Sequence, residues 1–194
     1  MGATIDCEIR DKDGNLVSKT TKQSDSFVSN FLLAMYGLTT AGATLTSGIA
    51  IVTDTGGNLL LFPSASSLSK PLMYAMGVSG NTSFGIQVGL SGTAPLSSDY
   101  SLNGLCTTIG YSSTSGWGIA NNSGAWVYFN RVFTNNTGSN IVIQEAGIAV
   151  QDTTSNSLFG SSSGAFLILH DVTGAQTVAP NNALTVNYSL YTYV

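Results

Sequence analysis

Residues 184–194 read LTVNYSLYTYV, a stretch in which apolar and polar side chains alternate as far as Leu190. A period of two is the pattern of a β-strand with one face on a core and one in water. Tyr191 and Tyr193 add aromatic area to the polar face. Because tyrosine combines an apolar ring with a polar end, it suits wet contacts between subunits. We assign Tyr191 and Tyr193 to a candidate assembly interface; the alternative is that they pack on a neighbouring loop.

Further strands are predicted wherever the same alternation, or a short apolar run, is bounded by Gly, Asn and Ser. They cover residues 48–52, 59–62, 84–89, 125–133, 141–150 and 165–171, with polar loops predicted at 64–69, 91–99, 111–123 and 151–163. Several strands separated by such turns are typical of a β-sandwich or barrel. The predicted fold is all-β, an antiparallel, jelly-roll-like β-sandwich with one N-terminal α-helix on or beside it.

A long hairpin is predicted from residues 125–133 and 141–150, folded about residue 138. In this register Arg131 lies opposite Glu145, and opposite charges that face each other across two strands stabilise the pair. A catalytic glutamate with an arginine partner would need a second acid or base, and none is near in sequence. We therefore predict that Arg131 and Glu145 form a structural cross-strand pair.

The charged residues are concentrated at the N-terminus, where nine of the sixteen lie in the first 25 positions. Residues 4–10 alternate as a strand does, DKDGN at 11–15 supplies turn residues, and residues 16–21 return as a second strand. The Asp-x-Asp-Gly run also resembles the start of a calcium loop, but the twelfth position, which needs Glu, holds Lys22. We predict a hairpin turn and no metal site.

The one predicted helix follows this hairpin, with Ser24 or Asp25 as its cap. Phe27 and Phe31 belong to an apolar stripe that ends at Gly37, and a helix with such a stripe packs on a sheet. Phe27 and Phe31 are also candidates for an assembly interface. The chain is thus divided into a charged docking element, residues 1–38, and a β-sandwich body, residues 39–194, which together form one continuous domain.

The composition excludes several classes of protein. The 194 residues include six Lys or Arg and ten Asp or Glu, a charged fraction of 8%, against roughly 25% in ordinary proteins. So few cations, without a basic stripe, argue against nucleic-acid binding. The apolar stretches are too short to cross a membrane. The apolar fraction of 43% is enough for a core and argues against disorder.

The residues that could carry chemistry lack the necessary context. Ser162 fits the Gly-x-Ser-x-Gly pattern, but that nucleophile elbow joins a strand to a helix, whereas this run leads from a loop into a strand. His170 is therefore predicted to be a strand-end residue. Cys7 and Cys106 are far apart, have no Cys-x-x-Cys partner, and are predicted to be buried free thiols. We predict no catalytic residue, no cofactor and no metal.

Four groups of segments follow one another along the chain: DKDGN (11–15) with SDSFVSNF (24–31), IQVG (86–89) with DY (99–100), FNRVFTNN (129–136), and LILHDV (167–172) with TVAP (177–180) and LTVNY (184–188). This order resembles that of tailed-bacteriophage virion proteins, and the closing strands are similar to those of phage head and tail accessory or decoration proteins. The resemblance implies a non-enzymatic structural protein of the virion. Such a protein is made in the host cytoplasm without a signal and assembles as a homo-oligomer with other virion proteins.

The alternative function is a carbohydrate-binding or adhesin-like module that binds a host-surface glycan. Trp117 lies between two glycines in a Ser-rich segment, with Tyr111 nearby. Exposed aromatic rings stack on sugars, so Tyr111 and Trp117 are the candidate glycan-stacking residues, whereas Trp126 is predicted to lie in the core.

Overall fold

The computed structural model describes residues 2–24, 27–33, 50–62, 75–121, 124–151 and 164–193. Residues 29–33 are helical, and almost all the other regular structure is strand, which confirms the predicted all-β class. The strands are β1 (Gly2–Arg10), β2 (Leu16–Ser24), β3 (Ala50–Thr53), β4 (Leu59–Phe62), β5 (Gly85–Gly89), β6 (Gly110–Tyr111), β7 (Ser115–Asn121), β8 (Gly124–Thr134), β9 (Ile141–Gln151), β10 (Ala165–Val178) and β11 (Ala183–Tyr193).

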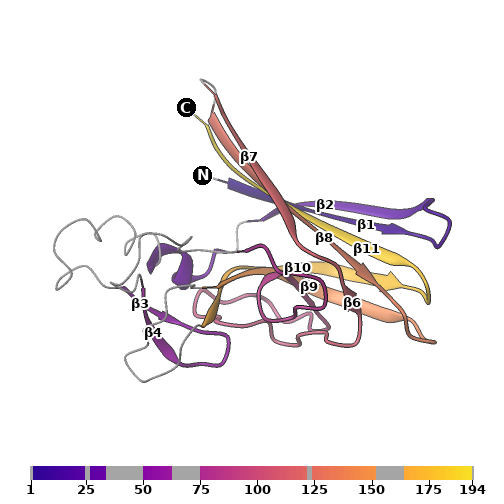
Figure 1. Cartoon of the computed structure of the whole chain (residues 1–194), viewed down its shortest axis with the longest axis horizontal. Coiled ribbons are helices and arrows are strands. Elements are labelled where there is room, and N and C mark those ends of the chain that lie inside the picture. The colour runs from indigo at the N-terminus through magenta and orange to yellow at the C-terminus, as the bar shows by residue number, and fades with distance from the viewer. Residues whose placement is uncertain are drawn as a thin grey trace.

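Two antiparallel sheets face each other and form the sandwich (Figure 1). The larger sheet has the order β2-β1-β11-β8-β6, and β7 also pairs with β8. The smaller sheet has the order β10-β9-β5, while β3 and β4 form a separate hairpin. The ends of β7, β8 and β11 project beyond the smaller sheet as an arm, and both chain termini lie at this arm (Figure 1).

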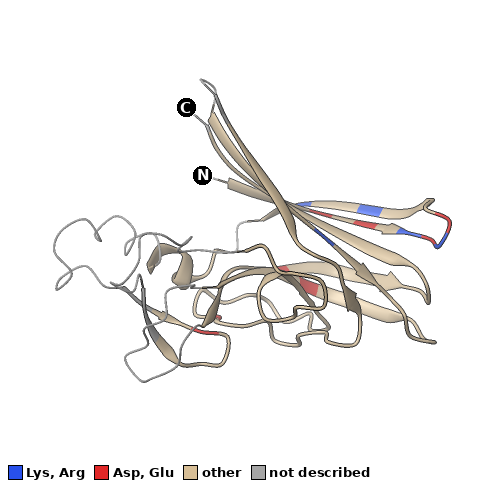
Figure 2. Ribbon diagram, in the orientation of Figure 1, with Lys and Arg blue, Asp and Glu red and all other residues tan. Residues whose placement is uncertain are grey.

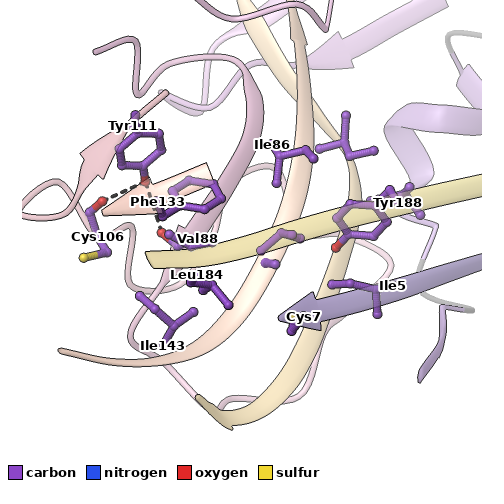
Figure 3. Close-up of a cluster of buried hydrophobic side chains, with 14 of the residues drawn as sticks. Ile5, Cys7, Ile86, Val88, Cys106, Tyr111, Phe133, Ile143, Leu184 and Tyr188 are labelled. Carbon is purple, nitrogen blue, oxygen red and sulfur yellow. Dashed lines mark hydrogen bonds between the residues drawn. The ribbon is translucent and has the colours of Figure 1, made fainter. Parts of the chain in front are cut away.

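The core fills the space between the two sheets (Figure 3). Every second residue of β1 and β11 points into it, as the alternation predicts, and these side chains meet the buried residues of β5 and β9. The fully or almost fully buried members include Ile5, Cys7, Ile86, Val88, Phe133, Ile143, Ile148, Leu184, Val186 and Tyr188.

The smaller sheet is also covered on its second face, which explains why β5 is buried throughout. Val28 and Leu102 pack there against Leu167 of β10. A strand covered on both sides reads as a continuous apolar run rather than as an alternating one. The helix at 29–33 therefore lies on a sheet, as predicted, but it begins after Phe27 and Val28. Leu32, which follows the buried Phe31, is 68% exposed.

The N-terminal hairpin is part of the larger sheet of the sandwich. β1 is hydrogen-bonded to β2 on one side and to β11 on the other, over its whole length. Ser24 does not cap the helix: it ends β2, and its hydroxyl donates to Oδ2 of Asp171 at 2.7 Å. Asp25, the other predicted cap, lies outside the described residues.

Two hairpins are closed by the same aspartate turn. Oδ1 of Asp11 accepts hydrogen bonds from the backbone N–H groups of Asp13 and Asn15, both at 2.9 Å. Asp54 does the same with Asn58, at 2.7 Å, in the β3–β4 hairpin. Gly14 takes the left-handed backbone conformation, with φ of 86°. The carboxylate of Asp11 thus fixes a turn, as the sequence predicts.

The predicted pairing of residues 125–133 with 141–150 is wrong. β8 pairs with β11 in the larger sheet, and β9 pairs with β10 and β5 in the smaller one. The connection at 135–140 crosses from one sheet to the other, and the side chain of Asn135 stabilises it by donating to the carbonyls of Ser139 and Val178, both at 2.8 Å. Arg131 and Glu145 are therefore not cross-strand neighbours.

Candidate functional site

The exposed face of the larger sheet is the most informative surface of the molecule. We call it the outer face and define it as the side that carries Thr4, Asp6 and Glu8 of β1, the half-exposed positions of that strand. Residues directly opposite each other in paired strands point to the same face. The outer face can therefore be followed in rows from β7 across β8, β11 and β1 to β2.

The two rows at the arm are aromatic. One row runs from Ile119 through Trp126 to Tyr191, and the next places Trp117 beside Tyr128. The rings of Trp117 and Tyr128 are stacked, with centroids 4.3 Å apart and an interplanar angle of 20°. Trp117 is 58% exposed and Ile119 46% exposed. Large apolar side chains on a surface mark a contact site when they are contiguous.

The polar character of the outer face increases away from the arm. In the next row Asn130 donates to Oδ1 of Asn187 at 2.6 Å. Further along, Glu8 of β1 pairs with Lys19 of β2, with 2.8 Å between Oε1 and Nζ. Figure 2 shows that charged residues gather on the β1–β2 hairpin and that the described part of the arm carries none. The outer face thus has an aromatic end and a charged end.

Sequence reasoning missed β7 because Gly and Ser are frequent in residues 111–123, which were predicted to be a loop. Trp117 is exposed as predicted, but it lies on a strand. Trp126, expected in the core, is on the outer face and only half-buried. The signal that was available is the spacing of Trp117 and Ile119, which are two residues apart and therefore lie on one face of an extended strand.

The structure separates the remaining predicted site residues. Tyr191 lies on the outer face and accepts a hydrogen bond from Nε2 of Gln23 at 3.0 Å, whereas the side chain of Tyr193 lies outside the described structure. Phe31 is buried, and Phe27 is half-buried against the same core, with their rings 4.6 Å apart. They stabilise the interior, so their assignment to an exposed interface is wrong.

Tyr111 is also a core residue, which removes it from the predicted glycan-stacking pair. Its hydroxyl donates to the backbone carbonyl of Cys106 at 2.7 Å, and its ring packs edge-on against Phe133 (Figure 3). Burial raises the pKa of Tyr111 to about 12. The ring that stacks with Trp117 is Tyr128.

Arg131 is fully buried and is held by main-chain carbonyls rather than by Glu145. Its guanidinium donates to the carbonyl oxygens of Val78, Asn81, Phe84, Ile86 and Ser112, at distances between 2.6 and 3.2 Å. The guanidinium carbon also lies 4.7 Å from the centre of the Tyr111 ring. Burial lowers the pKa of Arg131 to about 10. This cation therefore fixes the segments before β5 and β7 against β8.

A second buried polar cluster is centred on His170 of β10. Nε2 of the imidazole lies 2.8 Å from Oε2 of Glu145, and Nδ1 lies 2.7 Å from Oδ2 of Asp99. The Glu145 carboxylate also accepts the backbone N–H groups of Asn103 and Gly104, at 3.1 and 2.6 Å. The predicted strand-end histidine is in fact completely buried inside its strand.

The electrostatics of this cluster favour an imidazolium between two carboxylates. Burial alone would lower the pKa of His170, but the hydrogen bonds to Glu145 and Asp99 outweigh it and raise the pKa. Burial would raise the pKa of Glu145, but His170 and the two backbone N–H groups lower it. Because both ring nitrogens bond to carboxylates, neither is open to take a proton from a nucleophile. Ser162 lies outside the described residues.

The described ranges contain no metal cluster and no membrane-spanning helix. No group of three or more His, Cys, Asp or Glu side chains in them could hold a metal ion. In those ranges, too, no helix has the length and apolar character needed to cross a bilayer. Cys7 and Cys106 are free and buried, as predicted, and burial together with Asp6 and Asp171 raises the pKa of Cys7 to about 12.

Searches of protein-family models, of curated proteins and of solved structures found no match to this chain. We therefore infer the function from the geometry of the outer face and of the arm.

Proposed function

We propose that the chain is a non-enzymatic structural component of a virus particle of the tailed-phage kind, in which it assembles with copies of itself and with other virion proteins. The observation that carries this proposal is the aromatic end of the outer face, where Trp117 and Ile119 are exposed beside Tyr128. Covering such a surface with a partner protein is favourable, because it removes apolar side chains from water.

The low charge of the arm supports assembly for a physical reason. Burying an unpaired charge in an interface is expensive, whereas burying aromatic rings and hydrogen-bonded Asn or Ser side chains is not. The described residues of β7, β8 and β11 on the outer face are uncharged, and the nearest ionic group of that face, Asp6, accepts a hydrogen bond from Thr21. The charged end, with Glu8 and Lys19, makes the two ends of the outer face chemically different, so that a partner binds it in one orientation.

The proposal is tested on particles produced from the genome that encodes the chain. Mass spectrometry of purified particles should detect its peptides in stoichiometric amounts. Particles made without the gene should regain the protein when the wild type is supplied in trans. The Trp117→Asp variant should not be incorporated, while Val17→Asp, an equally exposed position on β2, should be. A protein that is abundant in the lysate but absent from purified particles contradicts the proposal.

A glycan-binding function is the second candidate, and the stacked pair of Trp117 and Tyr128 is the observation that favours it. An exposed indole on a flat strand face, with Asn130 two residues from Tyr128, offers one apolar ring and one amide for a sugar. A glycan array followed by fluorescence titration in a Trp126→Phe background, which leaves Trp117 as the only tryptophan, tests this function. A saturable response that Trp117→Ala abolishes supports it, and a flat titration against every array hit eliminates it.

A further inference from the structure

Two of the edge strands of the larger sheet, β2 and β7, have opposite character. β2 carries Lys19 and Lys22, and lysines on an edge strand keep other strands from pairing with it. β7 carries no charged residue and no proline, and in the described part of the chain no strand pairs with the edge of β7 that faces away from β8. An open, uncharged edge is a template for one more strand.

The sequence of β7 shows which strand fits. It reads SGWGIAN and is symmetric in side-chain class about Gly118: a large apolar residue on either side, then a small residue, then a polar one. When two copies of β7 pair antiparallel about Gly118, the small residues of one copy lie opposite the small residues of the other. The polar residues at the strand ends likewise lie opposite each other. At the centre of the pairing, Trp117 lies opposite Ile119 of the second copy. A two-fold interface requires this self-complementarity.

We infer that two copies of the chain dimerise by antiparallel pairing of their β7 strands about a two-fold axis at Gly118. The inference rests on the proposed function, since it names a second copy as the partner of the assembly surface. Pairing about an axis perpendicular to the sheet keeps the outer faces of both copies on one side. The stacked pair of Trp117 and Tyr128 in one copy is then continued by Ile119 and Trp126 of the other.

The shape of the molecule permits this pairing. β7 lies on the arm that projects beyond the smaller sheet (Figure 1), so antiparallel arms overlap while the two bodies lie at opposite ends. The charged β1–β2 hairpins, with Glu8 and Lys19, are then remote from the contact (Figure 2).

A cysteine at position 118 tests both the partner and the register. A Cβ at Gly118 would lie 3.4 Å from the carbonyl oxygen of Trp126, an ordinary contact, so Gly118→Cys should fold. Two-fold pairing brings the two Cα atoms of residue 118 to about 5 Å, within reach of a disulfide. The copies of Ser115 lie about 20 Å apart in this register. The native thiols, Cys7 and Cys106, are buried and do not interfere.

The full-length Gly118→Cys chain should form a covalent dimer on mild oxidation, and the Ser115→Cys control should not. If Gly118→Cys fails to fold, a mixture of Trp117→Cys and Ile119→Cys chains should cross-link to each other. By sedimentation the wild type and Val17→Asp should be dimers, and Ile119→Asp should have a dimer dissociation constant at least tenfold higher.

Three outcomes overturn the inference: a monomeric wild type, polydisperse aggregates instead of dimers, or cross-linking at residue 115 as efficient as at residue 118. These outcomes differ from failure of the proposed function. A chain that is monomeric in solution but present in purified particles refutes only the β7 dimer. A dimer that never enters particles refutes only the function in the virion.

Discussion

Nε2 of His170 lies 2.8 Å from Oε2 of Glu145, and both side chains are completely buried. The two residues belong to adjacent strands of the smaller sheet, since His170 is paired with Gly147, two positions after Glu145. The imidazole and the carboxylate thus meet diagonally across β9 and β10. Asp99, from the loop after β5, binds the other ring nitrogen. The cluster joins that loop to the sheet, and its stability depends on the charge of the imidazole.

We expect the free energy of unfolding to begin to fall as the pH rises above about 6.5, the ordinary histidine pKa, before the cysteine thiols, with an ordinary pKa of about 8.5, are half ionised. The pKa of His170 is raised in the folded state, so its contribution is complete below the ordinary histidine pKa. That contribution is lost as the pH rises through the folded value. The pKa of Glu145 is lowered, so its contribution is present above the ordinary value and is lost as the pH falls through the folded one. Urea unfolding above about pH 6.5 measures the His170 slope, and urea unfolding below the ordinary glutamate pKa of about 4.3 measures the Glu145 slope.

The variant His170→Gln should remove the alkaline slope and reduce stability at pH 6 by about 2 kcal/mol, because hydrogen bonds to a charged group are lost inside the protein. Lys12→Gln, which changes an exposed cation paired only with Asp13, should leave the pH profile unchanged. An unchanged slope in His170→Gln would show that another group titrates.

Gly89 and Glu145 should be sensitive to each other. They are directly paired across β5 and β9, and a Cβ on Gly89 would contact Oε1 of the glutamate closely. Gly89→Ala should displace that carboxylate from His170 and cost about 3 kcal/mol, as overpacking in a core does. Gly138→Ala, at a position with open space around it, is the matched control and should change stability little. Thermal unfolding compares the two. Equal melting temperatures for Gly89→Ala and Gly138→Ala would show that the Glu145 side chain can move aside without a loss of stability.

Local patterns predicted most of the strands of this protein, although not β6 and β7, and they did not predict the partners of the strands. β4 was predicted with its observed bounds, and β11 to within one residue, because alternation and apolar runs are properties of neighbours along the chain. The pairing of β8 with β9 was wrong because a loop of Asn, Thr, Gly and Ser closes a hairpin or crosses between sheets equally well. Which of the two occurs depends on contacts distant in sequence, such as Asn135 with Val178.

In the candidate site, too, single residues were predicted from the sequence but their partners were not. Trp117 was singled out from its own neighbourhood, but its stacking partner was not, since Tyr128 is opposite it only in the observed register. Arg131 and Glu145 were paired because the predicted hairpin about residue 138 places them opposite each other. In the structure, Arg131 is bound by carbonyl oxygens and Glu145 by an imidazole. Because a buried charge can be satisfied by any complementary group, a register predicted from local sequence does not identify its partner.

Arg131→Lys should destabilise the protein by about 3 kcal/mol, although it keeps the positive charge. An arginine has five N–H donors in a planar group, and here they reach five carbonyls. An ammonium has three donors and cannot span them, so buried carbonyls are left without a partner. Arg10→Lys is the matched control, because Arg10 lies on the surface and pairs with Glu8. Urea unfolding measures both. If Arg131→Lys lowers the free energy of unfolding as little as Arg10→Lys does, this explanation is contradicted.

The N-terminal strand should be indispensable for folding, which distinguishes it from an attached docking element. Ile5 points into the core and is 2% exposed, while Thr4 beside it faces outward. Ile5→Lys places a charge among apolar side chains and should leave the chain unfolded or destabilised by more than about 4 kcal/mol. Thr4→Lys adds the same group to the outer face and should change stability by less than about 1 kcal/mol.

Circular dichroism and limited proteolysis compare these two variants with a chain that lacks residues 1–24. The truncated chain should lose its cooperative unfolding transition, because β11 is then left without its β1 partner and the core loses the buried side chains of that strand. A truncated protein that unfolds cooperatively, with the strand content of the remaining sheets, would mean that the body folds without β1.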